Sequence, residues 1–136
     1  MKLVTRNTDY AIRAIIYIAQ AKKRVIPVEE LTLALKIPQP FLRRLLQVLG
    51  KKGILKSHKG KGGGFILKAA PEKIRIIEIM RIFQGKVRLV DCMLKKQVCP
   101  NTGSCILGHK LKEIEKSVLR QLESITLVSL LKGGKS

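Results

Sequence analysis

All three cysteines of the chain lie in one stretch of fourteen residues, CMLKKQVCPNTGSC, from Cys92 to Cys105. Clustered thiolates can bind a metal, close a disulfide or act as a redox switch. The gaps of six and five residues around Cys99 differ from the paired C-x2-C motifs of structural zinc sites and thioredoxin-like proteins. A loop with these gaps, containing Pro100 and Gly103, can wrap around an object wider than one ion. An iron–sulfur cluster is such an object, and thiolates are its usual ligands.

Three cysteines leave one ligand position of a cluster open, and two side chains are candidates to fill it. The first is His109, which three residues separate from Cys105. The second is a carboxylate from elsewhere in the chain, of which Asp9 is the strongest candidate. Each has an ordinary structural explanation, because His109 could be a surface residue of a helix and Asp9 could favour a helix dipole. The residues alone leave this choice open.

Length and composition indicate a folded cytoplasmic protein. The chain has 136 residues, of which 46% are apolar, enough for one domain or a small domain with an appendage. No apolar run approaches the roughly 18 residues of a membrane span, and the N-terminus is not a signal peptide, so no membrane partner is expected. Because thiols stay reduced in the cytoplasm, clustered cysteines favour metal or redox chemistry over a structural disulfide.

Positive charge is concentrated in the middle of the chain, which has a formal net charge of +19. Between Leu31 and Pro71 there are nine Lys or Arg residues and no Asp or Glu. A stretch of one sign attracts a polyanion, although a lysine-rich solvated face is the simpler explanation. The charge coincides with a recognisable architecture, so double-stranded DNA is the expected partner.

That architecture is a winged helix-turn-helix. Apolar spacing predicts helices at 8–21, with Thr8 as N-cap, at 28–35, and from about 40 to 50 or 53. Two helices of this size joined by a few residues form a helix-turn-helix, whose second helix enters the major groove. Short strands at 54–55 and 65–67 flank HKGKGGG and form a hairpin, the wing, whose glycines allow close approach to DNA. The predicted fold class is mainly α with a small β-hairpin wing.

Two further helices are predicted after the wing. The first covers 72–84, and its inward-facing residues are Ile74, Ile77, Met80 and Ile82. The second is long, with a stripe formed by Leu107, Leu111, Ile114, Val118 and Leu122. Because little of the remaining chain can cover this stripe, we expect it to pack on its twin in a homodimer rather than fold back. The predicted domains are 1–84, a winged helix-turn-helix, and 85–136, the cysteine loop with the dimerisation helix.

The chain resembles the winged-helix iron–sulfur transcription regulators of the IscR and NsrR type. The likeness runs from KLVTRNTDYAIRA through the wing residues HKGKGGGF and the cysteine loop to LESITLVSLL. A GGGF wing combined with a three-cysteine loop is specific to these proteins, whereas neither feature is so alone. The resemblance implies a homodimeric DNA-binding regulator, a repressor, whose long helices cross and whose monomers each carry a cluster that senses nitric oxide, iron or redox state.

Position by position, the resemblance assigns the cluster to Cys92, Cys99 and Cys105. In IscR-type members a histidine that two residues separate from the last cysteine completes a [2Fe–2S] cluster, and His109 departs from that spacing. In NsrR-type members an aspartate in the first helix of the partner subunit completes a [4Fe–4S] cluster, and Asp9 occupies the matching position. The resemblance therefore favours Asp9 over His109, and a [4Fe–4S] over a [2Fe–2S] cluster.

The resemblance also assigns residues to DNA. Arg43 and Arg44 fall on the base-facing part of the recognition helix, where a guanidinium can bind guanine O6 and N7. Lys59 and Lys61 match wing residues that reach the minor groove, and Gln39 is expected to contact a base or phosphate. The expected DNA-binding set, with two lysines for phosphate contacts, is Gln39, Arg43, Arg44, Lys51, Lys52, Lys59 and Lys61.

Two alternatives retain DNA binding and change the role of the cysteines. They could form a thiol redox switch, or they could hold zinc in a structural loop. Enzymatic activity and an organic small-molecule substrate are not expected, because the two histidines and nine acids form no Ser/His/Asp or paired-carboxylate arrangement in the sequence.

Overall fold

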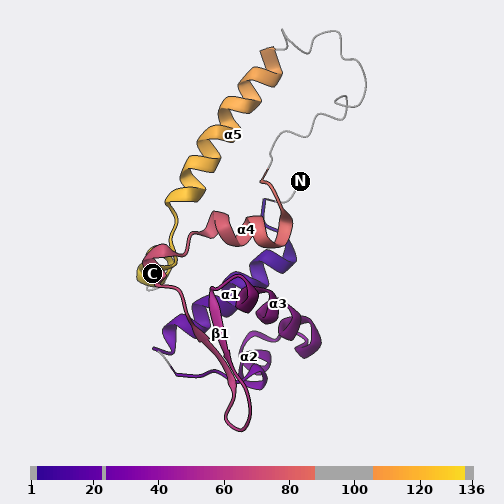
Figure 1. The fold of residues 1–136 in the computed structure, drawn as a ribbon. Coiled ribbons are helices and arrows are strands. Elements are labelled where there is room, and N and C mark those ends of the chain that lie inside the picture. The colour runs from indigo at the N-terminus through magenta and orange to yellow at the C-terminus, as the bar shows by residue number, and fades with distance from the viewer. Residues whose placement is uncertain (1–2, 23, 88–105, 134–136) are drawn as a thin grey trace.

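The computed structural model describes residues 3–22, 24–87 and 106–133, so Cys92, Cys99 and Cys105 lie outside the described residues. The mostly helical order with one two-stranded antiparallel sheet confirms the predicted fold class (Figure 1). The elements are α1 (Arg6–Gln20), α2 (Val28–Leu35), α3 (Gln39–Lys51), β1 (Leu55–His58), β2 (Gly64–Leu67), the 3-10 helix η1 (Pro71–Lys73), α4 (Ile76–Gln84), α5 (Ile106–Ser124) and α6 (Leu127–Gly133).

Helix α1 begins two residues earlier than the sequence predicts. Its N-cap is Thr5, whose hydroxyl accepts a 3.4 Å hydrogen bond from the backbone N–H of Thr8. The prediction of Thr8 as N-cap was wrong, because Thr8 lies in the first turn and is fully buried. The apolar face of α1 supplies the centre of the core through Ala11, Ala14 and Ile15.

The helix-turn-helix follows the predicted boundaries closely. Helix α2 ends at Leu35, and its C-cap Lys36 adopts a left-handed backbone conformation with φ of 57°. Helix α3 begins at Gln39, with Pro40 in its first turn, where a missing N–H costs nothing. The inward face of α3 buries Leu42, Leu46 and other leucines against α1 and α2, and its opposite face is left to solvent.

The hairpin is held against the segment between α1 and α2. Strands β1 and β2 pair antiparallel with Leu55 opposite Leu67 and His58 opposite Gly64. Ile26 then exchanges two 2.9 Å backbone hydrogen bonds with Phe65. A Cβ on Gly64 would lie 2.2 Å from the carbonyl oxygen of Ile26, so glycine is required there by the chain itself. The base of the wing is therefore fixed to the helix-turn-helix.

The helix predicted from residue 72 begins later. Residues 71–73 form η1, and Ile74 and Arg75 are extended before α4 starts at Ile76. Arg75 forms an isolated β-bridge with Thr126, and the carbonyl of Ile74 accepts a 2.8 Å hydrogen bond from the N–H of Leu127. Because residues 74 and 75 pair with this distant segment, they are extended, although their apolar spacing alone predicts a single helix over 72–84.

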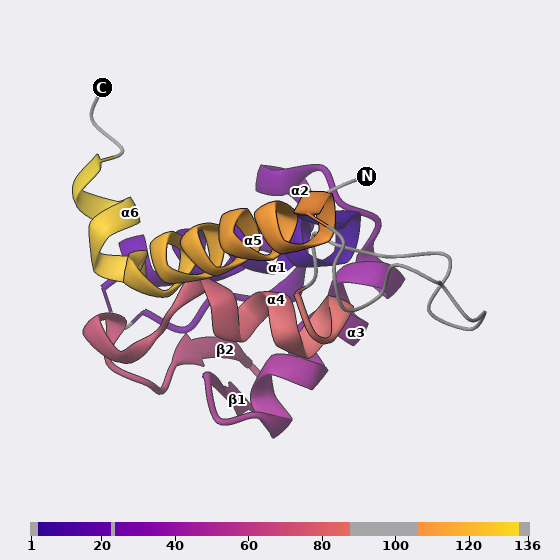
Figure 2. The ribbon, with the colours of Figure 1, turned by 90° about the horizontal axis from the view of Figure 1, so that it is seen from above.

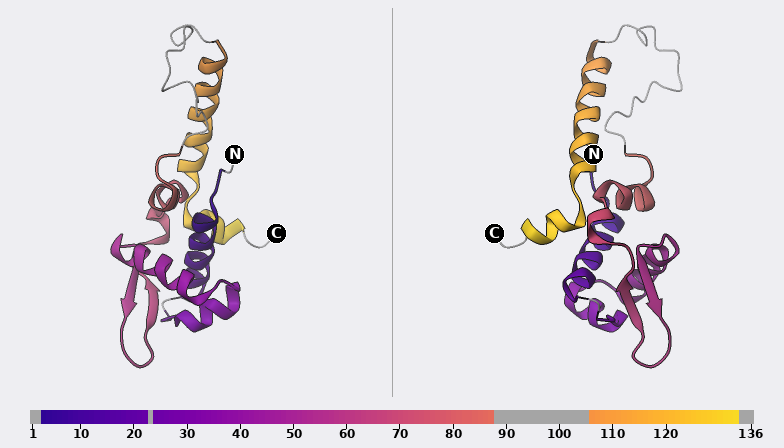
Figure 3. Two further views of the ribbon diagram at one scale, coloured as in Figure 1. Left: turned by 90° about the vertical axis from the view of Figure 1, so that its right-hand side faces the viewer. Right: turned by 60° about the vertical axis from the view of Figure 1, so that its left-hand side comes forward.

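Helix α5 projects from the rest of the molecule (Figures 1 and 3). Its C-terminal part buries Leu122 in a second apolar cluster with Ile76, Ile77 and Met80 of α4. Viewed from above, α4 and the hairpin lie to one side of α5, and α6 continues from its C-terminal end (Figure 2). None of the helices in the described ranges is long and apolar enough to span a membrane.

Helix α6 returns to the winged-helix body. Its Leu127 is 1% exposed and belongs to the same core cluster as α1, with Leu131 packed against that cluster. The predicted division at residues 84 and 85 stays a prediction, and this contact crosses it. The apolar stretch ITLVSLL thus contributes to the core of the N-terminal part.

Candidate nucleic-acid interface

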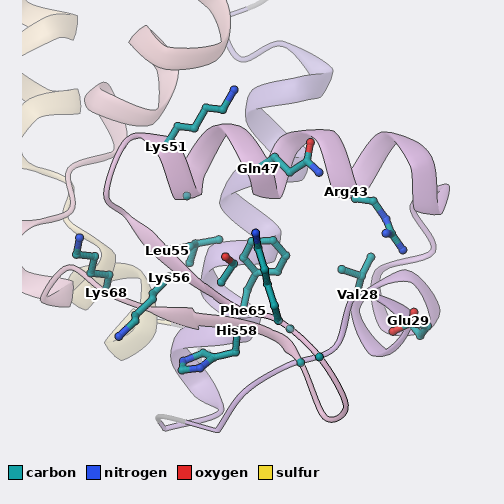
Figure 4. Close-up of a pocket in the computed structure, with 16 residues that line it drawn as sticks. Val28, Glu29, Arg43, Gln47, Lys51, Leu55, Lys56, His58, Phe65 and Lys68 are labelled. Atoms are coloured by element: carbon teal, nitrogen blue, oxygen red, sulfur yellow. The ribbon is translucent and has the colours of Figure 1, made fainter.

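A groove of about 710 Å³ lies between α3, the hairpin and the start of α2. Its apolar floor includes Val28, Leu55 and Phe65. Figure 4 shows Arg43, Gln47 and Lys51 on successive turns of α3, with Arg43 extending toward Val28 and Glu29 of α2. The charged and polar side chains that line the groove are Glu29, Arg43, Gln47, Lys51, Lys56, Ser57, His58, Lys59 and Lys68.

The groove and its surroundings are strongly positive. All nine Lys and Arg residues between Leu31 and Pro71 are exposed, and five of them line the groove, to which the described residues contribute one acid, Glu29. Within the described parts of the chain, the ion pairs join other residues, Asp9 with Arg13, Arg24 with Glu30, and Arg81 with Glu123. The nine cations are therefore available for phosphate groups.

Arg43 and Arg44, which the sequence analysis assigns to the same role, occupy different positions relative to the groove. Arg43 lines the groove, whereas Arg44, one residue and about 100° further round the helix, is exposed but does not line it. Gln39 is half-buried at the first position of α3. Arg43 and Arg44, the predicted base-facing pair, thus lie on neighbouring parts of the exposed surface of α3.

The predicted lysines divide in the same way. Lys51 and Lys59 line the groove, and Lys52 follows the last residue of α3 as its C-cap. Lys61 is exposed at the tip of the hairpin, between Gly60 and Gly62, which have φ of 90° and 78°. These positive φ angles make the turn that carries Lys61 outward, and L side chains rarely adopt them.

The predicted DNA-binding set left out six charged or polar groove residues: Glu29, Gln47, Lys56, Ser57, His58 and Lys68. Gln47 was detectable, because it lies four residues after Arg43 and such residues share a helix face. Lys56 and His58 needed a longer first strand than the sequence predicted. Glu29 had no signal, since only the packing of α2 beside α3 brings it to the groove.

A network of one ion pair and its hydrogen bonds connects α2 to α1 and to the segment between them. The Arg24 guanidinium donates to both carboxylate oxygens of Glu30, at 2.9 and 2.8 Å, and the hydroxyl of Tyr17 donates to the same group at 2.7 Å. The Arg24 hydrogen bonds, followed by that of Tyr17, lower the pKa of Glu30 to about 2. The same carboxylate raises the pKa of Tyr17 above its usual 10.0. The Tyr17 hydrogen bond joins α1 to α2, and the bidentate Arg24 contact holds the segment between these helices to α2.

The two candidate fourth ligands of a cluster lie on different elements. Asp9 is in the first turn of α1 and pairs with Arg13 at 3.0 Å, with 45% of the Asp9 side chain exposed. His109 is exposed on α5, four positions after Cys105 in the chain. The described residues bring no group of three or more metal-binding side chains together. In Figure 3, α1 belongs to the body of the molecule, whereas the start of α5 is the far end of the projecting helix.

Comparison with known proteins decides the family. The Rrf2 family model, described as an iron-dependent transcriptional regulator, matches residues 4–133. The chain belongs to the Rrf2 family. This Rrf2 protein is 32% identical over 130 residues to the transcriptional regulator NsrR of Halalkalibacterium halodurans, covering 94% of the chain and 89% of the relative. It is 31% identical over 134 residues to NsrR of Bacillus subtilis, covering 97% and 91%.

Solved structures agree with this assignment. IscR from T. potens superposes with a TM-score of 0.74 at 26% identity, covering 99% of this Rrf2 chain and 89% of that one. CymR, the global cysteine regulator of B. subtilis, has the same fold, with a TM-score of 0.80 at 22% identity and coverage of 97% and 98%. The predicted resemblance to IscR- and NsrR-type proteins is confirmed, and this Rrf2 protein is a DNA-binding transcription regulator of the winged-helix class.

Proposed function

We propose that this Rrf2 protein is a cytoplasmic, homodimeric repressor whose affinity for its operator is set by an iron–sulfur cluster on Cys92, Cys99 and Cys105. The observation that carries the DNA-binding part is the exposed, unpaired basic surface on α3 and the wing. The cluster part rests on the cysteine spacing, on the resemblance to IscR- and NsrR-type regulators, and on the iron-dependent character of the family.

The donor groups suit such a cluster. The chain supplies three thiolates, and thiolates are the ligands that most often hold iron–sulfur clusters. The carboxylate of Asp9 can complete the set at low cost, because an exposed i, i+4 ion pair such as Asp9–Arg13 contributes only about 0.3–0.5 kcal/mol. When bound, the cluster would supply a redox- and ligand-sensitive group, and the weaker carboxylate ligand would make it labile. These observations favour a [4Fe–4S] cluster, with His109 and a [2Fe–2S] cluster as the alternative.

Helix α5 supports the dimer. On this helix Leu107 is 66% exposed and Ile114 is 55% exposed, whereas Leu122 near its other end is buried. A stripe of aliphatic side chains at helical spacing that projects from the body is suited to a second copy of itself. In such a dimer the start of α5, which directly follows Cys105, meets the partner subunit. That arrangement favours Asp9 of the partner subunit as the fourth ligand.

The base and phosphate contacts follow from the positions on α3 and the wing. Arg43 and Arg44 would read base edges in the major groove from neighbouring sectors of α3. Lys59 and Lys61 would reach the minor groove from the wing. Phosphate contacts would come from the remaining three members of the set, Gln39, Lys51 and Lys52.

The coupling between cluster and DNA runs through α1. Asp9 is followed by Tyr10, whose ring meets the ring of Phe41 on α3 edge to face, with centroids 5.9 Å apart. A change in what Asp9 binds would therefore shift the helix against which the recognition helix packs. Two half-sites about 34 Å apart tolerate little such movement, so operator affinity would change.

The test is anaerobic purification followed by a visible spectrum and counts of iron and sulfide in wild type, Asp9→Ala and His109→Ala. About four iron and four sulfide per chain, lost more readily in Asp9→Ala, is the expected result. Two iron per chain that depend on His109 would replace the [4Fe–4S] assignment by the [2Fe–2S] one. A colourless protein would overturn the cluster and leave a thiol switch, and one zinc per chain without sulfide would establish the zinc alternative.

A further inference from the structure

Gln47 occupies the same reading surface as Arg43. It lies one turn further along α3, lines the same groove and is exposed. Gly50, one turn beyond Gln47, also lines the groove and adds no side chain there. Figure 4 shows the Gln47 side chain on the open side of α3 between Arg43 and Lys51. A ligand that reaches Arg43 from solvent would therefore also meet the amide of Gln47.

This amide has no other task in the described parts of the protein. Gln47 makes no hydrogen bond there, and the residue is exposed. Gln84 shows the contrast, because its amide accepts hydrogen bonds from Thr5 and Thr8 and donates one to Leu3. Gln84 is thus a structural glutamine, whereas Gln47 contributes nothing visible to holding α3 in place.

The chemistry of the two side chains is complementary to two different bases. In the major groove, an arginine fork matches O6 and N7 of guanine, and a glutamine amide matches N6 and N7 of adenine. Residues four apart on a helix are separated by about 6 Å along its axis. Base pairs are about 3.4 Å apart, so the two side chains reach bases one or two base pairs from each other.

We propose that Gln47 is a specificity-determining residue that reads an adenine one or two base pairs from the guanine read by Arg43. This inference rests on the proposed role of Arg43 in DNA reading and does not depend on the cluster. It assigns part of the operator sequence: each half-site contains a guanine and an adenine at that separation. The Gln47 amide could instead bind a phosphate, which would carry no sequence preference. The experiment distinguishes a contact with adenine from a contact with phosphate.

The experiment selects preferred sites from a randomised duplex library with the full-length protein, using wild type, Arg43→Ala, Gln47→Ala and Gln47→Arg. Gln20→Ala is the matched control, because Gln20 is an exposed glutamine at the end of α1, away from the groove. Thermal unfolding of each variant shows that it is folded. The expected discrimination for adenine at one position is about five- to hundredfold and is lost in Gln47→Ala.

Gln47→Arg provides the second readout, since arginine at this position should change the preferred base from adenine to guanine while other positions stay the same. Loss of affinity in Gln47→Ala that is equal for all sequences would overturn the proposal and make Gln47 a phosphate contact. A wild-type protein that prefers no sequence at all would instead refute the proposed DNA-reading function. A guanine preference that is lost in Arg43→Ala, with no position sensitive to Gln47, would refute this inference alone.

Discussion

The side-chain oxygen of Gln84 accepts a 2.7 Å hydrogen bond from the buried hydroxyl of Thr8, a residue 76 positions earlier in the chain. The same oxygen accepts the backbone N–H of Thr5 at 3.1 Å, and the amide nitrogen donates to the carbonyl of Leu3 at 2.9 Å. A single side chain at the end of α4 therefore holds the start of α1, immediately before Asp9.

Replacing Gln84 by Ala should lower the free energy of unfolding by about 1–3 kcal/mol. The substitution removes the acceptor of a buried hydroxyl and the partners of two backbone groups, and an unsatisfied buried polar group costs that amount. Urea denaturation measures the effect, with Gln20→Ala as the surface control, expected within about 0.5 kcal/mol of wild type. Equal stability of the two variants would show that the Gln84 contacts contribute nothing.

The Glu30 carboxylate should give stability a defined acid dependence. Its pKa in the folded protein is about 2, below the ordinary value of 4.5, so its stabilising contribution is present above pH 4.5. Protonation removes that contribution as the pH falls from 4.5 toward 2. In urea denaturation at several pH values, wild type should be more stable than Glu30→Gln at pH 6. This difference should shrink below pH 4.5, and a difference that stays constant down to pH 2 would contradict the pKa assignment.

Glu29 should weaken binding to DNA that has no preferred sequence. Among the described residues it is the only acid that lines the basic groove, and a negative charge near phosphate is repelled by about 1 kcal/mol at contact distance in water. Glu29→Gln should therefore raise the affinity for random duplex by about two- to fivefold at low salt. Titration by fluorescence anisotropy measures the affinity. Glu72→Gln, an exposed acid on η1 outside the groove, should leave it unchanged, and a similar gain in both variants would reduce the effect to net charge.

The apolar stripe on α5 should be required for the proposed homodimer. Leu111→Asp and Ile114→Asp place charges where two copies of α5 are expected to meet, and buried aliphatic side chains contribute about 1.5–3 kcal/mol each. The dissociation constant of the dimer should rise about a hundredfold or more, measured by sedimentation equilibrium. Leu33→Asp is the control, since Leu33 on α2 is 80% exposed and lies on another element. A dimer unaffected by the α5 substitutions would place the interface elsewhere.

The sequence correctly predicts the bounds of those helices whose ends depend on residues adjacent in the chain. The bounds of α2 match because Pro27 and the left-handed Lys36 end the helix within its own sequence. The start of α4 was wrong because Arg75 is drawn into a bridge with Thr126, a partner 51 positions away that no local pattern contains. The N-cap of α1 was misassigned because two threonines, Thr5 and Thr8, fit the cap signal, and only burial of Thr8 separates them.

The site was partly predictable for a similar reason. Positive charge without acids marked α3 and the wing, because charge is a property of composition. Gln47 and Gln84 carry no charge and belong to no motif, so nothing in the sequence distinguishes their roles. In the structure Gln47 lines the groove, whereas Gln84 binds residues at the start of α1. The cluster ligands stay predictions, since the three cysteines lie outside the described residues.

The turn of the wing combines glycines that its backbone requires with two exposed lysines, Lys59 and Lys61. Next to the turn, added atoms on Gly63 or Gly64 would overlap the backbone of His58 or Ile26, and the positive φ angles of Gly60 and Gly62 disfavour any side chain there, whereas Lys59 and Lys61 are exposed and have no positive φ. Within this turn, the side chains that the backbone leaves free to vary are therefore those of residues 59 and 61. If the wing meets the minor groove as proposed, a regulator built in this way can acquire a new preference for groove width through those two side chains, while the glycine turn that presents them is passed on unchanged.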